Sequence, residues 1–285
     1  MFRKLLKYDM KYVWNVWRIM AVSLFGLSVV GSFVLRYILE HFEKMEHSFS
    51  LAAMFMLFFA AAYLSIFAAA IITTVFVYLR FYKNFFTDEG YLTFTLPASR
   101  GTLLRAKTAN ALIWEGLFYL LLIVCAIPFA IISPPSQSGE LINLVVFETL
   151  GDAINQVWGE IGAWSLVYVI EFILFIVFSL FYSVAIMQLC ITIGAMLVKK
   201  AKALLGIGIY YGFSMVTSFI FQICYLAFIW VFIDGFGNLL AGSSETVICA
   251  FVALLLLVVC LIMATFALIV HSITQICLEK RLNLA

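Results

Sequence analysis

The chain has 285 residues, of which 66% are hydrophobic and only 11% are charged. A water-soluble domain carries about a quarter charged residues, so this composition excludes an ordinary soluble protein. The net charge of +2 is too small to indicate a nucleic-acid partner. The six cysteines lie within or beside apolar runs, which does not fit a disulfide framework.

Six apolar segments are long enough to cross a bilayer, because a crossing needs about 20 mostly apolar residues. The predicted spans are Ile19–Leu39, Leu51–Leu79, Ala109–Ile132, Trp164–Val198, Ala203–Ile233 and Val247–Val270. No soluble domain fits between them. The sequence therefore predicts an all-α fold, a polytopic membrane protein with six transmembrane helices in a single domain that comprises residues 1–285.

The distribution of charge predicts the orientation of these spans. Fifteen of the 17 basic residues precede span one, follow span six, or lie between spans two and three or four and five. The opposite side holds only Arg36, Lys44 and nine acids. Because cytoplasmic loops are enriched in Lys and Arg, this asymmetry predicts a multi-pass protein of the cell membrane with both termini in the cytosol. Splitting the long fourth segment would reverse the pattern, so we predict one helix there.

Two further segments are predicted to form helices on the membrane surface. Residues 1–18 place basic side chains on one helical face and apolar side chains and tryptophans on the other, as in a helix on the inner leaflet. This element is either an anchor for span one or part of a gate. The external loop, residues 133–163, contains Leu141–Trp158, which has apolar residues at helical spacing and predicts an interfacial helix.

The cytosolic loop, residues 80–107, has the most informative sequence, RFYKNFFTDEGYLTFTLPASRGTLLRAK. Pro97 interrupts a helix because it lacks an N–H and clashes with the preceding turn. Ser99 can cap a new helix that leads into span three. Between the two spans the loop carries acidic and aromatic residues, which fits a docking element for a soluble partner. The alternative is a solvated turn.

The order Glu89-Gly90, then Leu96-Pro97-x-Ser99, then Lys107 resembles the permease subunits of six-helix ABC exporters, in the ABC-type-2 permease family. It is similar in particular to the "EGYLTFTLP" variant common in Firmicute permeases. With the six spans and inside termini, the resemblance covers nearly the whole chain. It implies that this loop holds a coupling helix for an ATP-binding subunit. The docking residues implied by the resemblance are Asp88, Glu89, Gly90, Tyr91, Leu92 and Phe94, with Pro97 fixing the angle, and a second cytosolic contact at Lys199, Lys200 and Lys202.

The chain lacks a phosphate-binding loop of the form GxxxxGK[ST], so we expect it to bind no cofactor itself. ATP and Mg would be bound by a separate ABC ATPase subunit, and two ATPases would work with two permeases, identical or paralogous. The sequence offers no catalytic constellation and no strong metal-ligand spacing, so neither an enzyme nor a metal site is predicted.

The predicted function is ATP-driven outward movement of an amphipathic or hydrophobic substrate, with antimicrobial or toxin-like peptides as the leading expectation. Few charges lie within the spans, which argues against a strongly charged solute. The alternatives are export of small drug-like or lipid-linked molecules, or a membrane scaffold or sensor that docks a cytosolic protein.

Three ionisable residues within or near spans are candidate functional groups, because intramembrane charges are costly. We expect Glu115 to pair with Arg105, Lys107 or a neighbouring helix. Glu171 and Arg36 both lie towards the outer side and are expected to be within reach of each other. A structural ion pair is the alternative to a substrate-facing role.

Two sets of smaller residues predict contacts between helices. Asn110, Gln188 and Gln222 are expected to form interhelical hydrogen bonds. Gly208 and Gly212 lie four residues apart on span five, which predicts a close helix approach either within the bundle or between two permeases.

Overall fold

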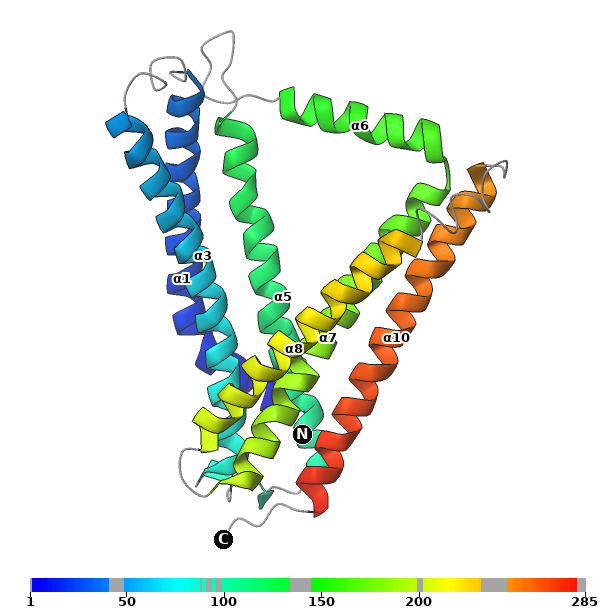
Figure 1. Ribbon diagram of the computed structural model, residues 1–285. Helices are drawn as coiled ribbons and strands as arrows, with labels where there is room; N and C mark the ends of the chain where they lie inside the picture. The colour runs from blue at the N-terminus through cyan, green and yellow to red at the C-terminus, as the bar shows by residue number, and fades with distance from the viewer. Residues whose placement is uncertain are drawn as a thin grey trace. The chain divides into compact units, whose positions relative to one another are not determined.

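The computed structural model describes residues 2–40, 49–87, 89–90, 94–95, 99–133, 145–198, 202–231 and 245–280, and within them it contains helices and no strand. The helices are α1 (Phe2–Glu40), α3 (Phe49–Phe86), α5 (Arg100–Ile132), α6 (Val145–Ile161), α7 (Trp164–Leu197), α8 (Lys202–Val231) and α10 (Glu245–Lys280) (Figure 1). The predicted all-α fold is confirmed over these residues.

Five described helices are long and apolar enough to cross a membrane. The apolar stretches are Leu6–Glu40, Ala53–Phe86, Arg100–Ile132, Trp164–Leu197 and Thr246–Glu279. Each is about 50 Å long at 1.5 Å per residue, whereas the hydrocarbon core is roughly 30 Å thick, so the helix ends extend beyond it. This length and composition make the chain a helical membrane protein. The apolar stretch of α8, Leu204–Ile220, is shorter.

The long fourth segment forms the single helix α7, as predicted. At the N-terminus, the predicted surface helix and span one together form α1, which continues without a break from Phe2 to Glu40. In its first part Lys7 and Lys11 are exposed, whereas Asp9 and Val13 are buried. Because α1 continues without a break across residue 18, a separate helix lying on the membrane surface stays a prediction.

The external loop contains a helix, as predicted. It is α6, whose described side chains are almost all exposed. Gly162 follows it with a φ of +62°, and its N–H bonds the Trp158 carbonyl at 2.9 Å. A left-handed residue after a helix favours glycine, and it lets the chain turn directly into α7. The position of α6 at the membrane surface stays a prediction.

The chain divides into two compact units, and the first comprises Met1–Val77 and Ala109–Val157. In this unit α1 runs antiparallel to α3, because Met20 contacts Thr73 and the Tyr37 ring lies 6.2 Å from that of Phe55. α1 runs parallel to α5. Trp17 of α1 packs against Trp114 of α5, and further along both helices Ser32 contacts Ser133. The core of this unit consists of Met20, Leu24, Ala69, Phe118 and Leu121.

The second unit comprises Tyr78–Thr108 and Trp158–Ala285, and in it α7 packs against both α8 and α10. The Tyr168 hydroxyl donates to the Cys249 carbonyl at 3.0 Å, and Phe181 contacts His271 further along both helices. α7 and α10 are therefore parallel. α8 runs antiparallel to α7, because Gly206 near its start meets Ile191 of α7, and Ser214 further along lies beside the earlier α7 residue Tyr182.

α8 packs closely on α7 at Gly206. A Cβ atom built there would lie 3.1 Å from the Ile191 Cα and 2.5 Å from the Tyr78 hydroxyl, so a larger residue fits only if these neighbours shift. By contrast, a Cβ atom at Gly208 or Gly212 would meet nothing within 4 Å. The two glycines that the sequence pattern singled out therefore face open space in the described chain, and Gly206 is the glycine of α8 that packs closely on a neighbouring helix.

Candidate functional site

The turn between α3 and α5, residues 87–99, contains most of the predicted docking residues. The Thr87 hydroxyl donates to the Lys83 carbonyl at 2.6 Å, and the Gly90 N–H donates to the Thr87 carbonyl at 2.7 Å, so hydrogen bonds connect Glu89–Gly90, which are helical, to the end of α3. Gly90 is buried, and a Cβ atom there would lie 2.8 Å from the Phe85 carbonyl oxygen. Gly90 therefore permits a close approach to the Phe85 backbone rather than presenting a surface.

Glu89 is the exposed acid among the described residues of this turn. Its carboxylate lies 3.6 Å from the Arg80 guanidinium, and 55% of its side chain is accessible to solvent. An ion pair so exposed contributes little to stability. Glu89 thus presents its carboxylate to solvent near the end of α3, and the contact with Arg80 restricts the orientation of the side chain.

Phe94 points inward from the same turn. Its ring lies 5.6 Å from the Phe85 ring, in an edge-to-face arrangement, and the Arg100 guanidinium lies 5.2 Å from its centre. Phe81 also packs on Phe85, with ring centres 4.9 Å apart, and both of these side chains are buried. Aromatic pairs of this kind are worth about 0.5–1.5 kcal/mol beyond their buried area. The described part of the turn is thus fixed on an aromatic cluster at the end of α3.

Arg100 joins this turn to the last helix. Its Nη1 donates to the carbonyls of Leu278 and Glu279, at 2.6 Å and 2.9 Å, in the final turn of α10. The last carbonyls of a helix have no partner within the helix, so a guanidinium there acts as a cap. Within this unit, the beginning of α5 and the end of α10 lie together, as expected if both face one side of the membrane. No local pattern around Arg100 predicted this contact.

The helix that leaves the turn begins as the sequence predicted. Ser99 precedes α5, and its Oγ accepts a hydrogen bond from the Thr102 N–H at 3.3 Å. The two hydroxyls are 2.8 Å apart. The prediction of Ser99 as a helix cap is confirmed.

Further along, α5 is tied to α7 by a buried polar contact. The Thr108 hydroxyl donates to Gln188 Oε1 at 3.0 Å, and Gln188 is 1% exposed. The predicted interhelical hydrogen bond of Gln188 is confirmed. For Asn110, the buried Oδ1 has no hydrogen-bond partner among the described residues. Within the second unit, α5 therefore connects the turn to α10 through Arg100 and to α7 through Thr108.

Several predicted contact residues lie outside the described residues. They are Asp88, Tyr91, Leu92, Pro97, Lys199 and Lys200. Lys202 is the first residue of α8, but its side chain is not among those described. The docking surface and the second cytosolic contact therefore stay predictions at these positions.

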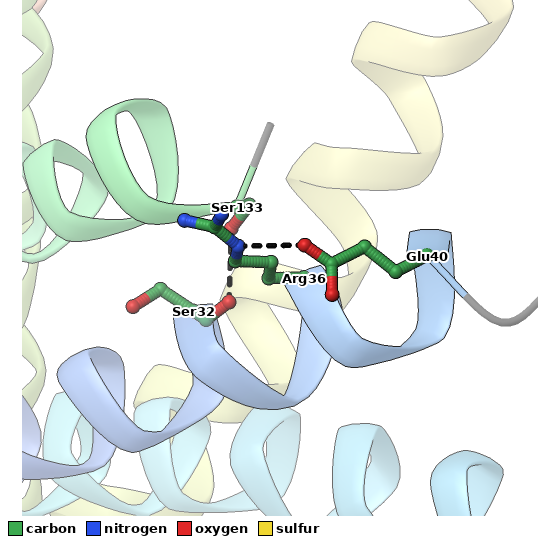
Figure 2. Close-up of polar contacts among 4 residues, drawn as sticks. All are labelled: Ser32, Arg36, Glu40 and Ser133. Atoms are coloured by element: carbon green, nitrogen blue, oxygen red, sulfur yellow. Dashed lines mark hydrogen bonds and ion pairs between the residues drawn. The ribbon is translucent and has the colours of Figure 1, made fainter. Parts of the chain in front are cut away.

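Arg36 forms an ion pair with a residue of its own helix. Its Nε lies 2.9 Å from Glu40 Oε1, and the Arg36 side chain is 11% exposed against 39% for Glu40. Figure 2 shows the guanidinium and the carboxylate directed toward each other, beside the hydrogen bond from the Ser133 hydroxyl to the Ser32 carbonyl. The charge of Arg36 is thus largely compensated within α1. The predicted contact with Glu171 would join the two units and stays a prediction.

Glu171 is a buried acid on the α7 face that meets α10. It is 5% exposed, and its Oε2 has no hydrogen-bond partner among the described residues. The Cys260 thiol of α10 contacts its backbone carbonyl at 3.8 Å. Burying a polar oxygen without a partner is unfavourable by a few kcal/mol, so Glu171 remains a candidate functional group.

Glu115 lies in the first unit near a cluster of three tryptophans. It is 9% exposed and has no ion-pair partner among the described residues. The rings of Trp14, Trp17 and Trp114 lie 5.7–6.4 Å apart, and the buried Nε1–H groups of Trp17 and Trp114 have no described partner. The predicted pairing with Arg105 or Lys107 would again join the two units and stays a prediction.

These features define a helical membrane protein in which a short charged turn is fixed to the ends of three long helices, α3, α5 and α10. Comparisons of the chain with protein-family models, with curated proteins and with solved structures find no match. The sequence and the geometry of the chain itself are therefore the basis for its function.

Proposed function

We propose that the chain is the permease subunit of an ATP-driven exporter of the ABC-type-2 kind. The observation that supports this most is the α3–α5 turn. It carries the sequence pattern of a coupling loop, exposes the carboxylate of Glu89, and is fixed on the ends of long helices by the Phe94 and Arg100 contacts. A partner that moves this turn would therefore move helices rather than a loose loop.

The proposed topology has six crossings with both termini in the cytosol. α7 and α10 run parallel, so the chain must return between them, and α8 runs antiparallel to α7. α8 continues to Val231, which gives it 30 residues, or about 45 Å. That length suffices for a sixth crossing. The excess of basic residues at the α3–α5 turn and at both termini favours a cytosolic position for them.

In the proposed mechanism, a separate ATPase subunit binds and hydrolyses MgATP and holds the exposed face of the turn through Glu89. The Asp88, Tyr91 and Leu92 side chains would complete this contact, with Pro97 fixing its angle. Movement of the turn would pass through Arg100 to α10 and through Thr108 to α7, since each contact joins α5 to one of these helices. Rotation of α7 and α10 would then open a path to the outside.

The proposed substrate is amphipathic or hydrophobic, and a peptide is the leading candidate. The described helices carry long exposed apolar faces and few charges, which suits a solute of low charge. A second function, export of drug-like or lipid-linked molecules, uses the same features. The scaffold alternative retains docking through the turn but predicts no transport.

The test is transport in inverted membrane vesicles that contain the chain and an ABC ATPase co-expressed with it as its candidate partner. We expect ATP-dependent accumulation of a fluorescent hydrophobic peptide, at least several-fold above vesicles that hold an ATPase unable to hydrolyse ATP. Accumulation of lipophilic dyes without the peptide would support the second function. If neither probe accumulates although ATPase and chain are both present, the exporter proposal is contradicted and the scaffold alternative is favoured.

A further inference from the structure

A pocket of about 200 Å³ lies between α7 and α8 in the second unit. Most of the side chains that line it carry hydroxyl groups, and these are Tyr182, Ser183, Tyr210, Ser214, Thr217 and Ser218. Both helices are otherwise strongly apolar in sequence. Such a concentration of hydroxyls on two facing helices sets this pocket apart from the surrounding surface.

The pocket lies near the middle of α7. Tyr182 is separated from the first residue of α7, Trp164, by about 27 Å of helix, and from the last, Leu197, by about 22 Å. If α7 crosses the bilayer, the pocket lies within the hydrocarbon and away from both lipid headgroup regions. The headgroup of a lipid in the bilayer therefore does not reach it.

The hydroxyls of the pocket retain capacity for hydrogen bonds to a ligand. Thr217 donates to the Phe213 carbonyl of its own helix at 2.9 Å, which uses its donor but leaves its oxygen able to accept. Ser183 and Ser214 line the same space and are only partly buried. A hydroxyl group can both donate and accept, so together these groups match a ligand that presents donors and acceptors side by side.

The other lining residues restrict the class of ligand. Ile186 and Phe213 add apolar surface, and none of the lining side chains is charged. A phosphate or carboxylate group would enter without a counter-charge, which is unfavourable in an apolar surrounding. The volume is below the 300–1,000 Å³ typical of sites for whole drug-sized ligands, so only part of a larger ligand fits.

We propose that this pocket, the hydroxyl pocket, binds an uncharged, hydrogen-bonding segment of the transported molecule, namely backbone amides of a hydrophobic peptide. Amides supply donors and acceptors in alternation, and the tyrosine and phenylalanine rings contact the neighbouring apolar side chains. The proposal rests on the proposed exporter function for its biological role, but binding itself requires no ATPase.

The test is photolabelling of the purified full-length chain in lipid nanodiscs. The probe is an N-acetylated, C-amidated hydrophobic tripeptide that contains a photoreactive phenylalanine analogue. We expect saturable labelling of α7 and α8 fragments. The double variant Ser183→Ala with Ser214→Ala should label at least fivefold less, because the hydrogen bonds are lost. Ser214→Phe, which fills the pocket, should also label at least fivefold less.

The matched control is Ser179→Ala on α7. Ser179 is half-buried, its hydroxyl donates to the Ile176 carbonyl at 2.9 Å, and it does not line the pocket. Its labelling should equal that of the unmodified chain, and size-exclusion profiles should show that all variants are folded.

Equal labelling of the folded pocket variants and the control would overturn the proposal. Stronger labelling by a photoreactive phosphatidylglycerol than by the tripeptide would overturn it as well. The photolabelling assay contains no ATPase, so a failed transport experiment would not affect its result. Likewise, a failure of photolabelling would not contradict ATP-driven transport.

Discussion

Glu89→Ala is expected to lower ATP-driven transport by about tenfold while leaving the amount of folded chain in the membrane unchanged. Glu89 is more than half exposed, so its carboxylate is available to a cationic group on the ATPase. A tenfold loss corresponds to about 1.4 kcal/mol, a reasonable value for one charged contact at a protein interface. The measurement is ATP-dependent peptide uptake by inverted vesicles, normalised to the amount of chain.

Two further variants separate docking from the ion pair with Arg80. Glu148→Ala removes an exposed acid on α6 and should leave transport unchanged. The double exchange Arg80→Glu with Glu89→Arg preserves an ion pair but reverses the outward charge, so we expect it to remain as defective as Glu89→Ala. Recovery of transport in the double exchange would show that Glu89 acts only within the chain, and the docking role would be withdrawn.

Gly206→Ala is expected to destabilise the protein by about 1–3 kcal/mol, because it forces an extra methyl group into packed surroundings. Its Cβ would lie 3.1 Å from the Ile191 Cα of α7, which is tighter than ordinary van der Waals contact, and 2.5 Å from the Tyr78 hydroxyl, and backbone cannot move aside as easily as a side chain. The control is Gly208→Ala, two residues along the same helix, where the methyl group meets nothing within 4 Å. It should be neutral or stabilising by up to about 1 kcal/mol, because alanine favours helix over glycine.

The measurement for this pair is reversible unfolding of the purified chain in mixed micelles, followed by circular dichroism. Gly206→Ala should unfold at a lower concentration of denaturing detergent than the unmodified chain, and Gly208→Ala at an equal or higher one. Equal unfolding of the two variants would contradict the packing of α8 on α7 at Gly206. If Gly208→Ala prevents assembly with another chain but leaves the unfolding concentration unchanged, Gly208 would instead lie at a contact with that chain.

The sequence predicted the helices better than their contacts. Apolar length and charge depend on local composition, so they were enough to predict α7 as one helix and a helix in the external loop. Ser99 was also predictable, because a helix cap bonds the residue three positions later. The Arg100 contact joins residues 178 positions apart. Nothing in the local pattern around Arg100 identifies a backbone carbonyl of α10 as its partner, so this contact needed the structure.

The predicted docking residues illustrate the same limit. Gly90 and Phe94 lie in a polar loop, where exposure is the ordinary expectation, yet one is buried and the other packs on Phe85. Phe81 and Phe85, spaced by one helical turn, gave a signal for an aromatic cluster that could receive Phe94. For the glycines of α8, spacing alone indicated Gly208 and Gly212, but which glycine faces a neighbour depends on the rotation of the helix. Local sequence does not determine that rotation.

The most direct test of the account is crosslinking from the α3–α5 turn to the ATPase. A photoreactive amino acid placed at Thr95, which is exposed in this turn, should crosslink to an ABC ATPase co-expressed with the chain as its candidate partner. The same group at Ala153, exposed on α6, should not, because α6 lies on the opposite side of the membrane in the proposed topology. Crosslinking from Thr95 alone is the predicted result. Crosslinking from Ala153, or from neither position when both proteins are present and folded, would contradict the proposed permease.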